Sequence, residues 1–163
     1  MNYYFLTLFV LCTLYALWAG GAPERIGAII YAFCVVATFL VLTAHRLPWL
    51  NFEVGAFIVD AATFLAFFPL ALRANRFWPL WVTALLGLGV LGHLARLAGP
   101  SAPDVLRWAY AVLLTIWSYP ILALIALGTF LHRQRLKRHG ADRSWVSSSS
   151  RSTPTPPAAP TAS

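Results

Sequence analysis

Charged residues are scarce in this chain. Only 10% of its 163 residues are Asp, Glu, Lys or Arg, while 60% are hydrophobic; globular proteins average about 25% charged residues. This composition supplies too little polar surface for a water-soluble domain, so lipid must be the solvent for much of the chain. The basic residues lie mainly at the ends of apolar runs and in the C-terminal part. Membrane topology accounts for that placement, so the net positive charge does not indicate nucleic-acid binding.

Sequence motifs that would identify a chemistry are also missing. The chain has no Walker A loop, no H-E-x-x-H, no G-x-S-x-G and no glycine fingerprint for dinucleotides. Its cysteines, Cys12 and Cys34, lie in apolar segments without a C-x-x-C or a Cys/His metal spacing. We therefore expect no disulfide, metal or cofactor, and the sequence favours a non-enzymatic protein.

The apolar runs predict an all-α fold, a polytopic membrane helix bundle over residues 1–131. Five transmembrane helices are expected at about 2–19, 24–44, 54–72, 79–98 and 103–131, and Gly or Pro lies at or near most of their boundaries. A basic juxtamembrane segment follows at 132–139. The tail at 140–163 is rich in Ser, Thr and Pro and lacks the apolar content to fold, so we expect it to be disordered.

The distribution of basic residues predicts the orientation. Nine of the 12 Lys and Arg residues would lie on the side of the C-terminus, including Arg73 and Arg76 in an expected surface loop. The positive-inside rule then places the C-terminus in the cytoplasm and the N-terminus outside. No basic residue precedes the first apolar run, so the charged start of a signal peptide is absent and we expect a retained first helix.

The hairpin from Val54 to Ala98 carries ionisable residues within its apolar helices: Asp60 on the first, His93 and Arg96 on the second. At about 1.5 Å per residue, Asp60 and His93 both lie roughly 8–9 Å from the same membrane surface. We therefore expect Asp60 to meet His93, Arg96 or both in the outer leaflet. Two interpretations stay open. The residues could be an inert pair that holds two helices together, or an intramembrane proton or ion site.

Two further groups of polar residues have expected locations. The first should gather at the outer face, just above the hairpin site: His45, Arg46, Glu53, Asp104 and Arg107. The second belongs to the basic juxtamembrane segment and is a candidate contact for anionic lipid head groups, with a plain stop-transfer anchor as the alternative: Arg133, Arg135, Lys137 and Arg138.

Several short stretches carry a resemblance. They are Gly20-Gly-Ala-Pro-Glu-Arg25, Val59-Asp60, Ala71-Leu-Arg-Ala-Asn-Arg-Phe-Trp-Pro-Leu-Trp81, His93-Leu-Ala95 and Trp117-Ser-Tyr119. Together they resemble a group of small, uncharacterised, multi-pass bacterial inner-membrane proteins, over roughly residues 15–130. The resemblance implies an inner-membrane location and brings no assigned activity, substrate or catalytic residue.

Three hypotheses of function follow. The first is a non-enzymatic membrane scaffold or accessory protein, with a membrane-protein partner or a second copy of the chain as candidate partners. The second is a small channel or transporter that uses Asp60, His93 and Arg96. The third is a membrane redox protein, in which His45 and His93 would hold a haem.

Overall fold

The computed structural model describes residues 3–44, 52–98, 104–140 and 145, with side chains at these positions except 42, 44, 52–53, 95–98, 104–115 and 139. The described chain forms five helices: α1 (Tyr3–Ala19), α2 (Ala22–Ala44), α3 (Phe52–Arg73), α4 (Trp78–Ala98) and α5 (Asp104–His139). The prediction of an all-α helix bundle is confirmed.

Three of these helices contain stretches long and apolar enough to cross a membrane: Ala22–Val41, Val54–Arg73 and Ile116–Arg138. Two further apolar helical stretches within the described residues, Tyr3–Ala19 and Trp78–Leu94, are shorter. A hydrocarbon core of about 30 Å requires roughly 20 apolar residues in a helix. The three long stretches therefore indicate a membrane protein.

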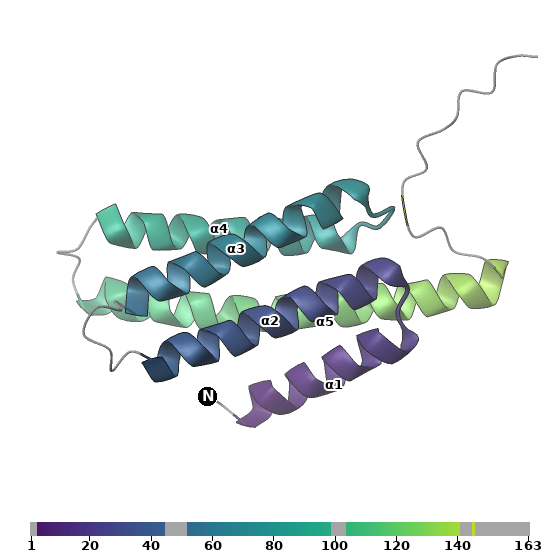
Figure 1. Ribbon diagram of the computed structural model, residues 1–163, viewed down its shortest axis with the longest axis horizontal. Coiled ribbons are helices and arrows are strands. Elements are labelled where there is room, and N and C mark those ends of the chain that lie inside the picture. The colour runs from purple at the N-terminus through teal and green to yellow at the C-terminus, as the bar shows by residue number, and fades with distance from the viewer. Residues whose placement is uncertain (1–2, 45–51, 99–103, 141–144, 146–163) are drawn as a thin grey trace, which may run out of the picture.

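The helices lie side by side along the long axis of the molecule (Figure 1). α2 packs against α3, α3 against α4 and α4 against α5, and α1 closes the ring by packing against both α5 and α2. The α1–α2 turn and the α3–α4 connection lie at the same end of the bundle, where α5 extends beyond the other helices (Figure 1). This end is called the turn end below.

The short turn between α1 and α2 follows from its sequence. Gly20 and Gly21 separate the two helices, and the Gly20 amide donates to the carbonyl of Ala16 at 3.0 Å to complete the last turn of α1. Pro23 lies in the first turn of α2, where its missing N–H would have had no helical partner. Glu24 then comes one residue later, in the same first turn.

Large apolar side chains occupy both the centre and the outside of the bundle. The centre includes Phe67, Val82 and Leu122, all fully or almost fully buried. On the outside, Phe33, Leu65 and Leu91 are among many large apolar residues that are more than half exposed. A protein in water would bury such groups, whereas lipid solvates them, so this surface agrees with a membrane protein.

The C-terminal part of the chain differs from the sequence-based expectation in two ways. α5 continues through the basic segment to His139, rather than ending near Leu131. In the predicted disordered tail, Trp145 forms an antiparallel bridge with Ala74 in the α3–α4 connection. The other tail residues, except Gly140, lie outside the described residues.

Candidate functional site

Asp60 and His93 lie against each other across the α3–α4 hairpin. The His93 Nε2 atom is 2.9 Å from Asp60 Oδ2, and the His93 side chain is 3% exposed while that of Asp60 is 29% exposed. Phe57, one turn before Asp60, places its ring edge against the imidazole with centroids 6.2 Å apart. Because an ionised carboxylate can only accept, the hydrogen bond requires a proton on Nε2, and the contact is also an ion pair when His93 is doubly protonated.

The other residues predicted for this region are described only in part. Arg96 belongs to α4, Glu53 to α3, and Asp104 and Arg107 to α5, but their side chains lie outside the described set. His45 and Arg46 lie outside the described residues altogether. Haem binding by His45 and His93 therefore stays a prediction. The described geometry of this site is therefore the contact between Asp60 and His93.

A second polar cluster lies at the turn end and was not predicted from the sequence. It consists of Glu24, Arg76, Trp78 and His132, and is called the Glu24 cluster below. Glu24 comes from the first turn of α2, Arg76 from the α3–α4 connection, Trp78 from the first turn of α4, and His132 from the last third of α5. The expectation that Arg76 lies on a surface loop is wrong, since the residue is only 8% exposed.

Hydrogen bonds link the four side chains of the Glu24 cluster. The Glu24 carboxylate is fully buried, and its Oε1 atom accepts from Trp78 Nε1 at 3.1 Å and from Arg76 Nε at 3.3 Å. The Arg76 Nη2 atom lies 3.4 Å from His132 Nδ1. Because a guanidinium group can only donate, this bond requires Nδ1 of His132 to accept. The carboxylate and the guanidinium thus neutralise each other at a buried site.

The second carboxylate oxygen, Glu24 Oε2, has no hydrogen-bond partner among the described residues. Burying a carboxylate is costly unless its charge is paired and hydrogen-bonded. Among the described residues, the two hydrogen bonds to Oε1 are therefore the interactions that offset the cost of burying this carboxylate. Removing either donor should be more damaging than removing a bond between exposed groups.

Two glycines make room for the Trp78 indole. A Cβ atom at Gly27 of α2 would lie 2.5 Å from Trp78 Cη2, and a Cβ at Gly128 of α5 would overlap Cδ1 of the same ring and lie 2.6 Å from Nε1. The indole therefore sits between the backbones of α2 and α5. This placement brings its N–H to the Glu24 carboxylate.

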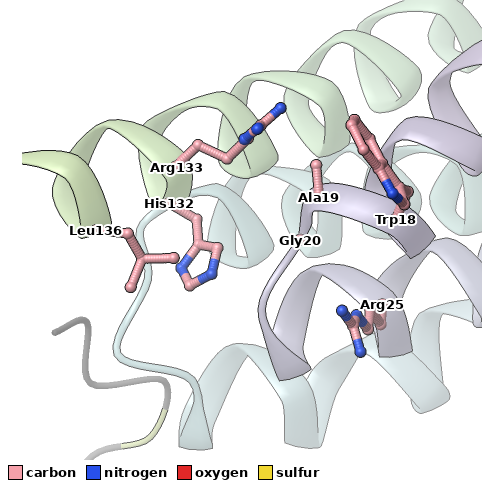
Figure 2. A pocket seen from close by; sticks show the side chains of 7 residues that line it. All are labelled: Trp18, Ala19, Gly20, Arg25, His132, Arg133 and Leu136. Carbon is pink, nitrogen blue, oxygen red and sulfur yellow. The ribbon is translucent and has the colours of Figure 1, made fainter. Parts of the chain in front are cut away.

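A pocket of about 300 Å³ opens beside the Glu24 cluster (Figure 2). Its walls come from the end of α1, the start of α2 and the last part of α5. The lining residues are Trp18, Ala19, Gly20, Arg25, His132, Arg133 and Leu136. His132 belongs to both the pocket wall and the Glu24 cluster.

Of the four basic residues predicted to contact lipid head groups, Arg133 lines this pocket. Its guanidinium carbon lies 5.3 Å from the centre of the Trp18 ring, a cation–π contact. Arg135, Lys137 and Arg138 are exposed on the same helix. Among the described residues, no group of three or more His, Cys, Asp or Glu side chains is close enough to hold a metal ion.

No protein-family model, curated protein or solved structure matches this chain.

Proposed function

We propose that this protein is a multi-pass integral membrane protein of the bacterial inner membrane with five spans. Support for the two shorter spans comes from helix length. α1 has 17 residues and α4 has 21, which correspond to roughly 26 and 31 Å, close to the ~30 Å hydrocarbon core. Small mismatches of this kind are accommodated by tilt or by local thinning of the bilayer.

Within that location, we propose a non-enzymatic scaffold or accessory role. The observation that carries it is the pairing of buried charge. Glu24 is neutralised by Arg76, and Asp60 is bonded to His93, while large apolar side chains cover the outside of the helices. Paired charges hold helices in fixed positions, and the apolar outside offers surface to a partner helix or to a second copy of the chain.

The first test measures transport. The full-length protein is reconstituted into liposomes that contain a pH-sensitive dye, and a proton gradient or potential is applied. A scaffold should give a dye response equal to that of empty liposomes. A proton flux that Asp60→Asn abolishes would overturn the scaffold proposal.

That same outcome would support the second candidate, a proton or ion pathway through the Asp60–His93 pair. The observation that favours it is the unequal exposure of the two partners, since Asp60 is 29% exposed and His93 only 3%. Ionisable groups at membrane depth often mark proton or ion sites. A partly exposed carboxylate and a buried imidazole in hydrogen-bond contact are two groups that can pass a proton between them.

The second test measures topology. The proposal places the N-terminus outside and the C-terminus in the cytoplasm, following the positive-inside rule. Green fluorescent protein fused to the C-terminus should fluoresce, and alkaline phosphatase fused at the same place should be inactive. An active phosphatase would reverse the orientation and move the Asp60–His93 pair to the cytoplasmic leaflet.

A further inference from the structure

The pocket at the turn end is lined by cationic groups without an acidic counterpart. Arg25 contributes a permanent positive charge from α2, and Arg133 contributes another from α5. None of the lining residues is Asp or Glu. The nearest carboxylate in the sequence, Glu24, is fully buried and bonded to Arg76, so it does not cancel the charge of the pocket.

The guanidinium carbon of Arg133 lies over the Trp18 ring, 5.3 Å from its centre. Figure 2 shows both side chains in the space where the end of α1 approaches α5, with Arg25 on the neighbouring α2. A guanidinium in a cation–π contact still has N–H groups available to donate to an anion. The edge of a guanidinium matches the geometry of phosphate oxygens and can bind two of them at once.

The position of the pocket also suits a phosphate group. It lies at the end of the bundle, beside a Trp that is 77% exposed. Exposed Trp residues at helix ends are typical of the membrane interface, where phospholipid head groups lie. A volume of about 300 Å³ is also within the range of small-molecule pockets.

We propose that this pocket binds the phosphate group of an anionic ligand, either a phospholipid head group or a free phosphate, through Arg25 and Arg133. The lipid source rests on the membrane location proposed above, whereas the free-phosphate source does not. The exposed basic residues further along α5 attract anions only diffusely, so binding depends on the two pocket arginines rather than on the number of charges.

The experiment is a ligand titration of the full-length protein in non-ionic detergent, followed by thermal unfolding. Short-chain phosphatidylglycerol, phosphatidylcholine with the same chains, and inorganic phosphate are the three probes. We expect a saturable rise in Tm with phosphatidylglycerol or with phosphate. Arg25→Gln and Arg133→Gln should each weaken the midpoint of that response at least tenfold. Arg133→Lys, which keeps the charge but loses the two-pronged edge, should also weaken it.

The control is Arg135→Gln, two residues along the same helix, exposed and outside the pocket wall. It should change the midpoint less than twofold. A response to phosphatidylglycerol alone identifies the lipid source, and an equal response to inorganic phosphate identifies the free anion. The proposal would be overturned if Arg135→Gln weakened the midpoint as much as Arg133→Gln, or if no probe gave a saturable rise in Tm. Resistance of the protein to alkaline extraction from membranes tests the membrane location separately.

Discussion

Adding a single methyl group at Gly128 should destabilise the turn end of the bundle. The new Cβ would overlap the Trp78 ring at Cδ1 and lie 2.6 Å from its Nε1 atom. Since both atoms belong to a rigid ring, the indole must move. The ring cannot retreat freely toward α2, because the Gly27 backbone lies against its other side.

The expected cost has two parts. Overpacking a well-filled interior costs about 1–3 kcal/mol. Movement of the indole also lengthens the 3.1 Å bond to Glu24 Oε1, and a hydrogen bond to a charged group is worth about 1.5–3 kcal/mol. Replacing Gly by Ala in a helix returns up to about 1 kcal/mol. The net loss in the free energy of unfolding should be roughly 2–5 kcal/mol.

The measurement is equilibrium unfolding in mixed micelles with increasing sodium dodecyl sulfate, followed by helical circular dichroism. Gly89→Ala is the matched control, because Gly89 is also inside a helix and a Cβ added there would meet nothing within 4 Å. Its stability should be unchanged or slightly raised by the better helix propensity of Ala.

Trp78→Phe provides the second control, since it removes the N–H and shrinks the ring. If the ring is what the methyl group meets, Gly128→Ala should cost less in a Trp78→Phe background than in the natural sequence. Equal costs in both backgrounds, or a Gly128→Ala variant as stable as Gly89→Ala, would show that the indole does not fill this space as described.

Three more predictions use the same unfolding measurement. Arg76→Gln should lower the free energy of unfolding by about 3–5 kcal/mol, because it leaves a buried carboxylate without its ion-pair partner. The control is Arg73→Gln, at an exposed residue where α3 ends, which should change the free energy of unfolding by less than about 0.5 kcal/mol. Similar losses in the two variants would contradict the buried ion pair. The double variant Asp60→Asn/His93→Gln should lose less stability than the two single losses added together, with a coupling energy of about 0.5–3 kcal/mol. Strictly additive losses would mean that the two side chains act independently. Deleting residues 141–163 removes the bridge to the α3–α4 connection and should cost about 1 kcal/mol; a much larger loss would indicate that the tail packs on the bundle.

The helices were largely predictable, because lipid-facing apolar runs and their Gly and Pro boundaries are local signals. For α2, the predicted start near residue 24 is close to the observed start at Ala22. For α4, the predicted start near residue 79 is close to the observed start at Trp78. The end of α5 was placed too early. The prediction ended the helix where the apolar run ends, but Arg and Lys are good helix formers, and His132 is buried among the other helices rather than exposed beyond them.

Of the two polar sites, the Asp60–His93 contact was predicted from the sequence and the Glu24 cluster was not. The contact between Asp60 and His93 was predictable because the rise per residue of a helix is fixed, so the sequence positions place both residues at the same depth. The Glu24 cluster was missed because Arg76 was assigned to a surface loop and His132 to the basic juxtamembrane segment. A signal was nevertheless present: in a five-helix up-and-down order, the connections that carry Glu24 and Arg76 lie at the same end. Which side chains turn inward depends on tertiary packing, which no local pattern encodes.

The closed ring of helices has a consequence for biosynthesis. Chains are made from the N-terminus, so Glu24 leaves the ribosome before Arg76, Trp78 and His132. The carboxylate cannot be paired until α3 and the start of α4 have been made, and its surroundings are complete only when α5 docks beside α1. Until then water must solvate the carboxylate, because an unpaired buried charge is costly. The surroundings of the Glu24 carboxylate can therefore be completed only after α5 has been synthesised.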